Sequence, residues 1–488
     1  MKIAILHPDF SDSTAPYKDS DVDCDAARLL AGHDVSEHFI RKSSAVRQVI
    51  ALSRENYDIF VNMCDGSWGE DTPGIEVVQA LEKEGCAFTG ASAKHYEPSR
   101  VVMKMAAHSA AVKFPAYVQV RSAEDITYVL ETLRFPMFVK HPESYSSVGL
   151  TRDSRVTDAA GLKREISRML AEYHGALVEE FVEGREFTVL VTEPADGQSE
   201  PWVLNPVEFT FPPNESFKHY DLKWVDYEQM DCLPVADEAL AKRLRLATGA
   251  IFSALGTDGY ARCDFRMTPD GAIFFLEINP NCGIFYPIGS YGSADFILQH
   301  DGGHKKFIEH IISCGLRRQK RSREPFRVRY RREAGFGLFA DRSIAAGSTI
   351  QVFEERAHYL VSRAHSQKVW PENKRQLFGR YTWPVSANVH VMWSDISSEW
   401  RPINHACDPN TWLEGLNVVA RRAIASGEQL TLDYATFCGP EMETFNCSCG
   451  STNCRGKITG NDWSLTELQS RYENHFSDYL TSLIKPQE

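Results

Sequence analysis

The chain has 488 residues, of which 43% are hydrophobic and 24% charged, and its formal net charge is −13. This length exceeds what one ordinary hydrophobic core serves, and the composition is that of a globular protein, so two to four domains are expected. The negative charge argues against broad non-specific binding of nucleic acid, which requires a basic surface, so we expect no direct nucleic-acid partner.

Targeting signals and cysteine usage indicate where the protein works. No segment approaches the ~20 consecutive apolar residues that span a bilayer, and Met1–Phe10 lacks the basic start and the cleavage site of a secretory signal. Eight of the twelve cysteines are scattered singly, as in proteins of reducing compartments. We therefore expect a cytoplasmic protein with no membrane partner.

The first two-thirds of the chain alternates between strand-like and helical patterns. Five short apolar segments are predicted strands: Lys2–Leu6, Asp58–Met63, Met137–Lys140, Ala176–Phe181 and Phe187–Val191. One helix is expected to begin after a cap at Thr157, and another spans Ala239–Leu255 and ends at Gly256. A hairpin follows, formed by Ala261–Met267 and Ala272–Asn279. This alternation predicts an α/β region of at least two lobes.

The composition becomes polar and basic at Cys314–Pro325, and we place an interdomain linker at residues 316–325. Beyond it, short β-rich segments continue to about residue 460, and Ser464–Ile484 is predicted to be one amphipathic helix. The arginine-rich stretch Arg317–Arg332 is either a nuclear-localisation signal or a solvated linker followed by a strand whose arginines face water. We favour the second interpretation, which leaves a nuclear location as the alternative.

The predicted hairpin gathers oxygen ligands. Asp264 lies on its first strand, and Glu277 and Asn279 lie on its second strand, where alternation puts both on one face. Strand pairing can bring Asp264 opposite them, with Arg262 on the face of Asp264. Two carboxylates and an amide oxygen arranged in this way suit Mg²⁺.

A second feature suits phosphate groups. Lys140 ends a predicted strand and is followed by the Ser/Gly segment Ser144–Gly149, whose backbone N–H groups can fold over phosphates. A lone lysine at a strand end is usually only solvated, but the order of these features along the chain favours a nucleotide site.

Together these features resemble the D-alanine–D-alanine ligase branch of the ATP-grasp family over residues 1–315. The matching segments are Val61–Gly74, Thr89–Gly90, Met103–Lys104, Phe138–Lys140, Ser144–Gly149, Glu179–Glu186, Gly259–Asp264 and Leu276–Gly283. The resemblance implies an α/β ATP-grasp fold of three subdomains, at residues 1–98, 99–182 and 183–315.

The resemblance also implies how individual residues bind ATP and two Mg²⁺ ions. Phosphate would be bound by Lys104, Lys140, Ser146, Ser147 and Lys223, adenine by Glu179 and the Val182 backbone, and ribose by Glu186. Asp264, Glu277 and Asn279 would ligate Mg²⁺. Arg262 would steady the transferring phosphate and the tetrahedral intermediate. The implied reaction converts a carboxylate into an acyl phosphate, which an amine attacks to give an amide.

The chain departs from the ligases after its first strand. The motif that grips the ammonium group of the first substrate is replaced by His7–Ser13 and by the acidic stretch Asp19–Asp25. D-alanine is therefore not the expected substrate. The acidic stretch suits either a pocket for a basic amino acid or a surface loop, and both interpretations stay open.

Cysteines cluster near the end of the chain. Cys447, Cys449 and Cys454 lie within eight residues, a spacing that suits one tetrahedral Zn²⁺, and Cys407 is the candidate fourth ligand. A disulfide is disfavoured, because a reducing compartment is expected and three clustered thiols leave one unpaired.

Three motifs accompany this cluster: Gly335–Ala340 (GFGLFA), Arg401–Asn410 (RPINHACDPN) and Gly427–Tyr434 (GEQLTLDY). With the cysteines, they resemble a SET domain followed by a post-SET zinc segment. The resemblance implies a mostly-β SET domain at residues 326–437, a post-SET segment at 438–460 and a C-terminal helix at 461–488. S-adenosylmethionine would contact the backbone of Phe336, Gly337 and Leu338 and the side chains of Asn404 and His405.

The implied reaction moves a methyl group to an amine, with Tyr434 as the active-site phenol. A free lysine, with a pKa near ~10.4, is almost wholly protonated at neutral pH, so a narrow aromatic tunnel beside the sulfonium must lower its pKa and align it. Leu432 has no hydroxyl to restrict the site to one methyl, which predicts di- or trimethylation. Pro402 replaces a usual aromatic residue, so the tunnel wall is expected to differ from that of histone enzymes.

The favoured interpretation is a bifunctional enzyme. It would ligate an amino acid or small peptide through its carboxylate and methylate a lysine-type amine on the same molecule. The alternative is a protein (histone) lysine methyltransferase whose ATP-grasp region is a regulatory nucleotide sensor. A third interpretation is a binding module in which neither site turns over. Proteins that resemble D-alanine ligases often dimerise, so a homodimer is an open alternative, and the sequence does not fix the oligomeric state.

Overall fold

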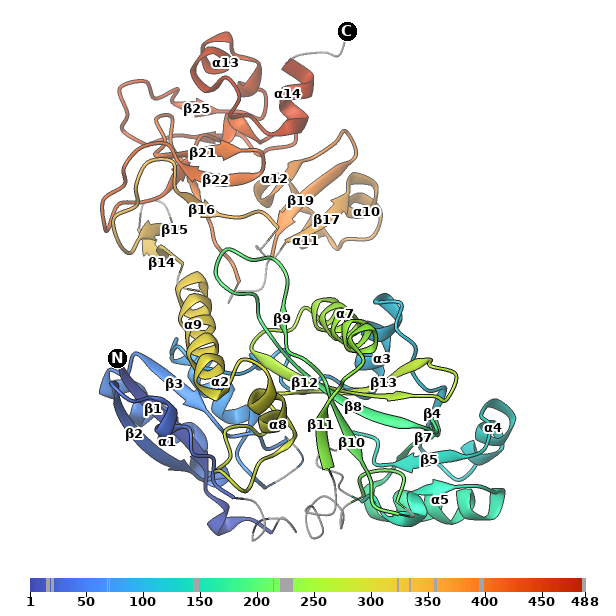
Figure 1. Cartoon of the computed structure of the whole chain (residues 1–488). Helices are drawn as coiled ribbons and strands as arrows, with labels where there is room; N and C mark the ends of the chain where they lie inside the picture. Colours follow the sequence, from blue (N-terminus) through green and yellow to red (C-terminus); the bar gives the residue numbers. More distant parts are fainter. Residues whose placement is uncertain are drawn as a thin grey trace. The chain divides into compact units, whose positions relative to one another are not determined.

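The computed structural model describes residues 1–14, 18, 22–67, 69, 71–143, 149–213, 215–219, 231–322, 324–332, 335–354, 358–394 and 399–484. Its contacts divide the chain into two compact units, Met1–Ser322 and Arg323–Glu488. In Figure 1 the first unit runs from blue to yellow and the second from orange to red.

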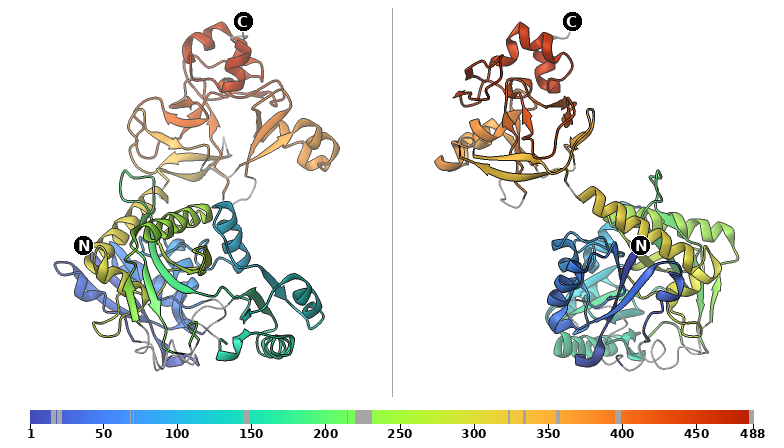
Figure 2. Two further views of the ribbon diagram at one scale, coloured as in Figure 1. Left: turned by 45° about the vertical axis from the view of Figure 1, so that its right-hand side comes forward. Right: turned by 90° about the vertical axis from the view of Figure 1, so that its left-hand side faces the viewer.

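The first sheet of the first unit lies within residues 1–98 and has the order β2-β1-β3, with all strands parallel. Its strands are β1 Lys2–Pro8, β2 Asp34–Ile40 and β3 Ile59–Asn62. Alternate residues of β1 enter opposite cores: Ala4 and Leu6 pack with α1 (Ala45–Leu52) and α2 (Ile75–Lys83). Ile3 and Ile5 share a core with residues of α8 (Ser293–His300) and α9 (His304–Ser322) (Figure 2).

The second sheet lies within residues 99–182 and has the order β4-β7-β5-β6. Its elements are β4 Tyr117–Val120, α4 Asp125–Thr132, β5 Met137–Lys140, β6 Arg155–Val156, α5 Ala159–Tyr173 and β7 Ala176–Glu180. The N-cap of α5 is Asp158, whose side chain accepts a hydrogen bond from the Gly161 N–H, and not the predicted Thr157. Either residue type caps a helix, so the sequence pattern alone is ambiguous by one residue.

The third sheet lies within residues 183–315 and is antiparallel, in the order β11-β10-β8-β12-β13, with β9 on β8. Its strands are β8 Arg185–Thr192, β9 Trp202–Val203, β10 Val207–Thr210, β11 Asp231–Pro234, β12 Tyr260–Met267 and β13 Ile273–Pro280. One face packs against α3 (Arg100–Ser109) and α7 (Glu238–Leu255) (Figure 1). Gly256 ends α7 with a φ of 61°, as predicted.

The second unit consists mostly of short strands in small sheets, which confirms the predicted fold class. These sheets are β14-β15, β16-β22-β21, β17-β19-β18, β20-β23 and β24-β25. The strands are β14 Phe326–Arg331, β15 Gly335–Ala340, β16 Thr349–Gln351, β17 His358–Ser362, β18 Thr382–Pro384, β19 Val389–Trp393, β20 Asn404–His405, β21 Thr411–Glu414, β22 Asn417–Ala420, β23 Thr431–Leu432, β24 Phe445–Asn446 and β25 Lys457–Ile458. Between β17 and β18 lie the short helices α10 Arg363–Lys368, α11 Glu372–Arg375 and α12 Phe378–Tyr381.

The predicted linker at residues 316–325 is wrong for its first part, since α9 continues to Ser322. Its basic side chains bind the first unit: Arg317 Nη2 donates to the Pro194 carbonyl at 2.7 Å, and Arg318 Nη1 to Glu193 Oε2 at 2.7 Å. The basic residues at the end of α9 are therefore hydrogen-bonding partners of the first unit and not part of a solvated linker. The boundary between the two units does lie within the predicted segment.

The single helix predicted at Ser464–Ile484 is also wrong, because two short helices occupy this segment. They are α13 Thr466–Tyr472 and α14 Asp478–Ile484. Glu473 has a φ of 44°, a conformation that a right-handed helix does not continue through. Within the described residues, none of the helices combines the length and apolar character that crossing a membrane demands.

Candidate active sites

The hairpin β12–β13 brings the predicted metal ligands together. Its register pairs Asp264 with Glu277 and Arg262 with Asn279. The Asn279 amide lies 3.3 Å from Asp264 Oδ2 and 3.4 Å from Glu277 Oε1, and Thr188 Oγ1 donates to Asp264 Oδ1 at 2.6 Å. The predicted convergence of two carboxylates and one amide is confirmed, and these oxygen-bearing groups are of the type that Mg²⁺ prefers.

Arginines neutralise both carboxylates. Arg262 donates to Asp264 through Nε at 3.2 Å and Nη2 at 3.0 Å. Burial by itself lowers the pKa of Arg262, but Asp264 raises it above the ordinary value. Arg100 forms an ion pair with Glu277. Burial by itself raises the pKa of Glu277, but Arg100 and Lys140 hold it well below its usual range.

Arg100 is a site residue that the sequence motifs did not identify. It lies in the first turn of α3 and is 5% exposed. A signal was present, because Arg100 precedes Lys104 by four residues and so shares its helix face. Its partner comes from a strand far along the chain, which no local pattern reveals.

A buried carboxylate connects the two lysines predicted to bind phosphate. Glu179 forms ion pairs with both amines: Lys104 Nζ lies 2.5 Å from Oε1 and Lys140 Nζ lies 2.8 Å from Oε2, and all three side chains are buried. Burial by itself raises the pKa of Glu179, but Lys140 and Lys104 lower it to about 2. Burial lowers the pKa of Lys140, despite the nearby Glu179. Two amines from different elements therefore converge on one carboxylate.

Glu186, the predicted ribose ligand, lies between two further cations. Arg266 Nε is 3.2 Å from Glu186 Oε2, and Lys218 Nζ is 3.4 Å from Oε1. Arg266 Nη1 also donates to the Val182 carbonyl at 2.8 Å. Arg266 therefore contacts both Glu186, the predicted ribose ligand, and the Val182 backbone, which is predicted to meet adenine. Lys218 and Arg266 were not singled out from the sequence, since neither belongs to a recognised motif.

Aromatic rings cluster beside these polar groups. Phe138 lies edge-on to Phe217 with ring centroids 4.9 Å apart, and Phe181 is 5.8 Å from Phe138. Apolar rings next to hydrogen-bonding groups are typical of sites for flat ligands. The predicted phosphate ligands Ser146, Ser147 and Lys223 lie outside the described residues.

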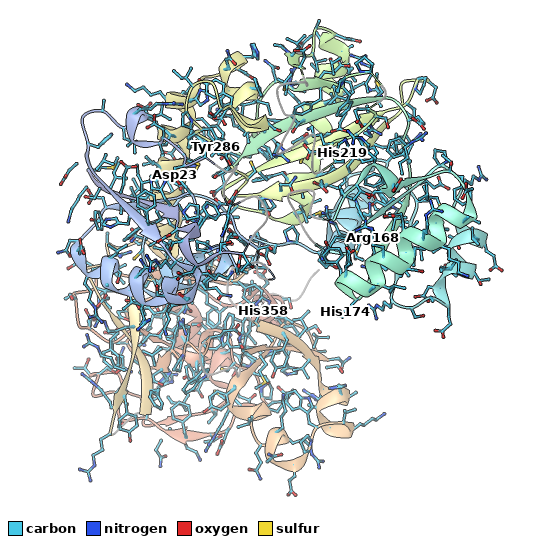
Figure 3. All side chains as sticks on the ribbon, turned by 90° about the horizontal axis from the view of Figure 1, so that it is seen from below. Asp23, Arg168, His174, His219, Tyr286 and His358 are labelled. Carbon is cyan, nitrogen blue, oxygen red and sulfur yellow. The ribbon has the colours of Figure 1, made fainter. Side chains whose placement is uncertain are left out.

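The acidic segment near the N-terminus lies against the loop that follows β13. The Asp25 N–H donates to the Phe285 carbonyl at 2.8 Å, and Arg28 Nη2 donates to the Tyr286 carbonyl at 2.9 Å. Figure 3 labels Asp23 and Tyr286, which belong to these two segments. Arg28 also pairs with Asp25 at 3.5 Å, so one of the acidic residues is already neutralised within the segment.

In the second unit, β15, β20 and β23 assemble the predicted S-adenosylmethionine residues. The Asn404 amide donates to the Phe336 carbonyl at 3.1 Å, and the Leu430 N–H donates to the Leu338 carbonyl at 2.8 Å. A Cβ at Gly337 would lie 2.7 Å from Asn404 Nδ2 and 2.6 Å from Gln429 Nε2. A side chain at position 337 would therefore displace these two amides from their present positions.

Tyr434 and His405 lie side by side in this site. The Tyr434 hydroxyl donates to the Ile403 carbonyl at 2.9 Å, and its N–H donates to His405 Nδ1 at 3.2 Å. Burial lowers the pKa of His405 to about 4, so the ring is neutral at pH 7 and its Nε2–H points toward Cys407 Sγ at 3.3 Å. Burial raises the pKa of the Tyr434 phenol, which stays protonated. Leu432 is buried beside them.

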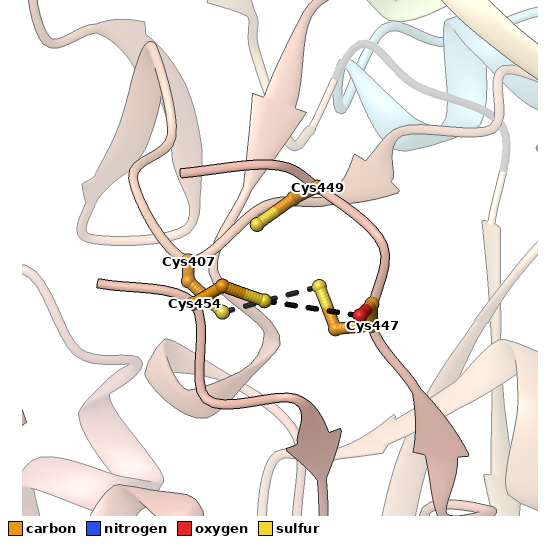
Figure 4. A group of neighbouring side chains, drawn as sticks. All are labelled: Cys407, Cys447, Cys449 and Cys454. Atoms are coloured by element: carbon orange, nitrogen blue, oxygen red, sulfur yellow. Dashed lines mark hydrogen bonds between the residues drawn. The ribbon is translucent and has the colours of Figure 1, made fainter. Parts of the chain in front are cut away.

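Cys407, Cys447, Cys449 and Cys454 converge (Figure 4). Their sulfur atoms all lie within 4.8 Å of one another, and Cys407 Sγ is 3.9 Å from Cys447 Sγ. Tetrahedral zinc with Zn–S bonds of about 2.3 Å requires sulfurs roughly 3.8 Å apart. The predicted set of four thiols therefore fits one zinc ion in number and spacing.

Family models match both units. The D-ala D-ala ligase C-terminus model matches residues 108–293, and the SET domain model matches residues 335–435. The D-alanine–D-alanine ligase of Chlorobaculum tepidum is 30% identical over 280 residues, which cover 55% of this chain and 72% of the relative. The ligase of Streptococcus agalactiae serotype Ia is 35% identical over 168 residues, and the chain spans only 44% of its length.

Solved structures of ligases also match the chain. The D-alanine–D-alanine ligase from Bacillus anthracis complexed with ATP has a TM-score of 0.49 and 19% identity, covering 66% of this chain and 98% of that one. D-alanyl-alanine synthetase A from Vibrio cholerae has a TM-score of 0.49 and 16% identity, covering 65% and 98%. On the sequence relationships, the chain belongs to the D-alanine–D-alanine ligase family of ATP-grasp proteins and carries a SET domain in its C-terminal region.

Proposed function

We propose that the chain is a bifunctional enzyme, an ATP-dependent carboxylate–amine ligase and an S-adenosylmethionine-dependent N-methyltransferase. The observation that carries the ligase is the convergence of Asp264, Glu277 and Asn279 on one hairpin, with Arg262 beside Asp264. Catalysis of phosphoryl transfer rests mainly on positioning and on charge, and this site supplies both.

In the ligase, an oxygen of the substrate carboxylate attacks the γ-phosphorus of ATP and ADP leaves. Lys104 and Lys140 bind the phosphates, with Ser146, Ser147 and Lys223 as the further phosphate ligands. Asp264, Glu277 and Asn279 would hold Mg²⁺, which would offset the negative charge of the transferring phosphoryl group. A neutral amine then attacks the acyl carbon, inorganic phosphate leaves, and the nitrogen loses a proton as the amide forms.

The remaining residues of the first unit bind and orient ATP. Arg262 stabilises the transferring phosphate and the tetrahedral intermediate, because its guanidinium is fixed by Asp264. Glu179 and the Val182 backbone meet the adenine, and Glu186 accepts the ribose hydroxyls. The Glu179 carboxylate also fixes both phosphate-binding lysines.

The carboxylate substrate is an amino acid or small peptide other than D-alanine. Residues at the end of β1 and just after it have partners in or next to β2: His7 lies 2.9 Å from Glu37, and Arg41 binds Asp9 at 2.8 Å. In D-alanine ligases, a different motif after the first strand binds the ammonium group of the first substrate.

In the methyltransferase, the nitrogen of a neutral lysine-type amine attacks the sulfonium methyl. The methyl–sulfur bond breaks and S-adenosylhomocysteine leaves. After the first and second transfers the methylated nitrogen loses a proton and can attack again, whereas a third transfer gives a quaternary ammonium with no proton to lose. Asn404, His405 and the backbone of Phe336, Gly337 and Leu338 bind the methyl donor. Tyr434, with Phe437 and Phe445 at ring-centroid distances of 5.5 and 5.9 Å, forms an aromatic wall that favours the uncharged amine.

The product carries two or three methyl groups, because Leu432 leaves room beside Tyr434 and offers no hydroxyl to hold a water. Zn²⁺ on Cys407, Cys447, Cys449 and Cys454 would fix the post-SET segment against the site. Leu432→Tyr should arrest the reaction at the monomethyl product. Mass spectrometry showing the same distribution of methylated products as the wild type would contradict this assignment.

The decisive experiment is untargeted mass spectrometry of products formed from amino acids with ATP and S-adenosylmethionine. The wild type should yield an amide that carries methyl groups. Glu277→Ala should abolish the amide and Tyr434→Phe the methyl groups. Methyl transfer to histones without any ligated product would favour the protein lysine methyltransferase with a regulatory ATP-grasp region. Absence of both products, with donor binding retained, would favour a binding module.

A further inference from the structure

Asp433 immediately precedes Tyr434 and its side chain is fully buried. Its carboxylate accepts from Arg455 Nη1 and Nη2, both at 2.7 Å, and from the Tyr472 hydroxyl at 2.9 Å. Oδ1 also accepts from the Ala435 N–H at 3.0 Å and so caps the 3₁₀ turn Tyr434–Thr436. A buried carboxylate requires such donors, because an unpaired charge in a protein interior is costly.

The donors come from two separate segments. Arg455 follows the thiol Cys454; its own N–H donates to Cys407 Sγ at 3.3 Å, and its Nε donates to Asp462 Oδ2 at 2.9 Å. Tyr472 ends α13 and is 0% exposed. It lies well beyond residues 335–435, where the SET model matches.

The C-terminal segment also contacts the turn Tyr434–Thr436 directly. The Ser477 N–H donates to the Thr436 carbonyl at 2.8 Å. Ala435 shares a buried cluster with Leu468, Tyr472, Phe476 and Leu480. The turn that carries Tyr434 is therefore held at its start by Asp433, at its end by Ser477 and along one side by apolar packing.

We propose that Tyr472 and Arg455 are positioning residues of the methyl-transfer site, acting through the Asp433 carboxylate on the turn that carries Tyr434. This proposal rests on the proposed methyltransferase function. Alignment of reacting groups is sensitive to small displacements. Loosening this turn therefore weakens transition-state alignment more than it weakens binding of the methyl donor.

Tyr472→Phe tests the proposal, since it removes one hydroxyl and keeps the buried ring. Tyr479→Phe is the matched control, because Tyr479 packs against the same cluster and its hydroxyl has no hydrogen bond among the described residues. Zinc content and the midpoint of thermal unfolding should be measured for both variants, so that loss of the metal or global unfolding is detected. Tyr472→Ala shows the effect of losing the ring as well.

Two readouts decide the outcome. Hydrogen exchange in a peptide spanning Asp433–Cys438 should accelerate in Tyr472→Phe and stay at the wild-type rate in Tyr479→Phe. The kcat for methyl transfer should fall about tenfold in Tyr472→Phe, while KM for S-adenosylmethionine changes less than about twofold. Wild-type exchange in Tyr472→Phe, or an unchanged kcat, would overturn the proposal. A wild type that transfers no methyl refutes the proposed function, and the exchange rates still decide whether Tyr472 fixes the turn.

Discussion

At the scale of single residues, Arg100 would compete with the proposed Mg²⁺ for Glu277. The guanidinium pairs with a carboxylate that is proposed to bind the metal. Arg100→Met should therefore lower the Mg²⁺ concentration required for half-maximal ATP binding by about tenfold, since a charge-assisted hydrogen bond contributes about 1.5–3 kcal/mol. Isothermal titration of ATP at several Mg²⁺ concentrations measures this shift.

A control for this prediction is Arg185→Met. Arg185 pairs with Glu208 on the same sheet and lies opposite Met267 in the strand register, three residues along β12 from Asp264. It should leave the Mg²⁺ dependence unchanged. A higher Mg²⁺ requirement in Arg100→Met would show that Arg100 assists metal binding and does not oppose it.

Glu179 gives a pH-dependent prediction at the same scale. Its pKa is lowered from 4.5 to about 2 in the folded protein, so its stabilisation is present above the unfolded value and is lost as the pH falls through this interval. Glu179→Gln should unfold with a free energy about 3 kcal/mol lower at neutral pH, because two buried lysines lose their partner. The deficit should shrink as the pH drops from about 5 to about 3.

Urea unfolding at several pH values tests this prediction, with Glu180→Gln as the neighbouring control. Glu180 is only half-buried, and one of its oxygens accepts a single backbone hydrogen bond from Arg134. A stability deficit of Glu179→Gln that stays constant with pH would show that the carboxylate of the wild type does not carry the depressed pKa.

The residues of the two sites show how far side-chain contacts can be predicted from the sequence. Asp264, Glu277 and Asn279 were identifiable, because strand alternation and a short hairpin determine which side chains meet. Arg100 was not, since its ion pair joins residues 177 positions apart. Tyr472 lies within the segment predicted to be amphipathic, but its hydrogen bond to Asp433 depends on how α13 packs.

At the scale of elements, the approach of β15 to β20 and β23 shapes the proposed methyl-donor site. A methyl group added at Gly337 would collide with the amides of Asn404 and Gln429. Gly337→Ala should therefore weaken S-adenosylmethionine binding by tenfold or more, about 1.4 kcal/mol, as measured by equilibrium binding. Gly335→Ala is the control, because a Cβ there meets no atom within 4 Å, although its φ of 70° disfavours alanine. Equal losses in both variants would contradict the assignment of the effect to this collision.

Elements with a strong local signal were predicted well. The ends of α7 and of β5 follow from capping and from apolar runs, and both match within one residue. The linker and the C-terminal helix were mispredicted, because tertiary partners override composition. Arg318 is retained in α9 by Glu193 and by the Phe88 carbonyl, and His475 after α13 is held by the Leu413 carbonyl at 2.7 Å.

At the scale of the whole molecule, the two units have separate hydrophobic cores. The described core clusters of residues 1–322 contain no residue of 323–488, and the reverse also holds. Each unit should therefore unfold in its own cooperative transition. Because a ligand stabilises only the unit that binds it, MgATP should raise the midpoint of one calorimetric transition, and S-adenosylmethionine that of the other. Chelation of zinc should lower only the second midpoint, since all four thiols lie in that unit. A single transition raised by both ligands would instead mean that the ligase and the SET domain fold as one cooperative body.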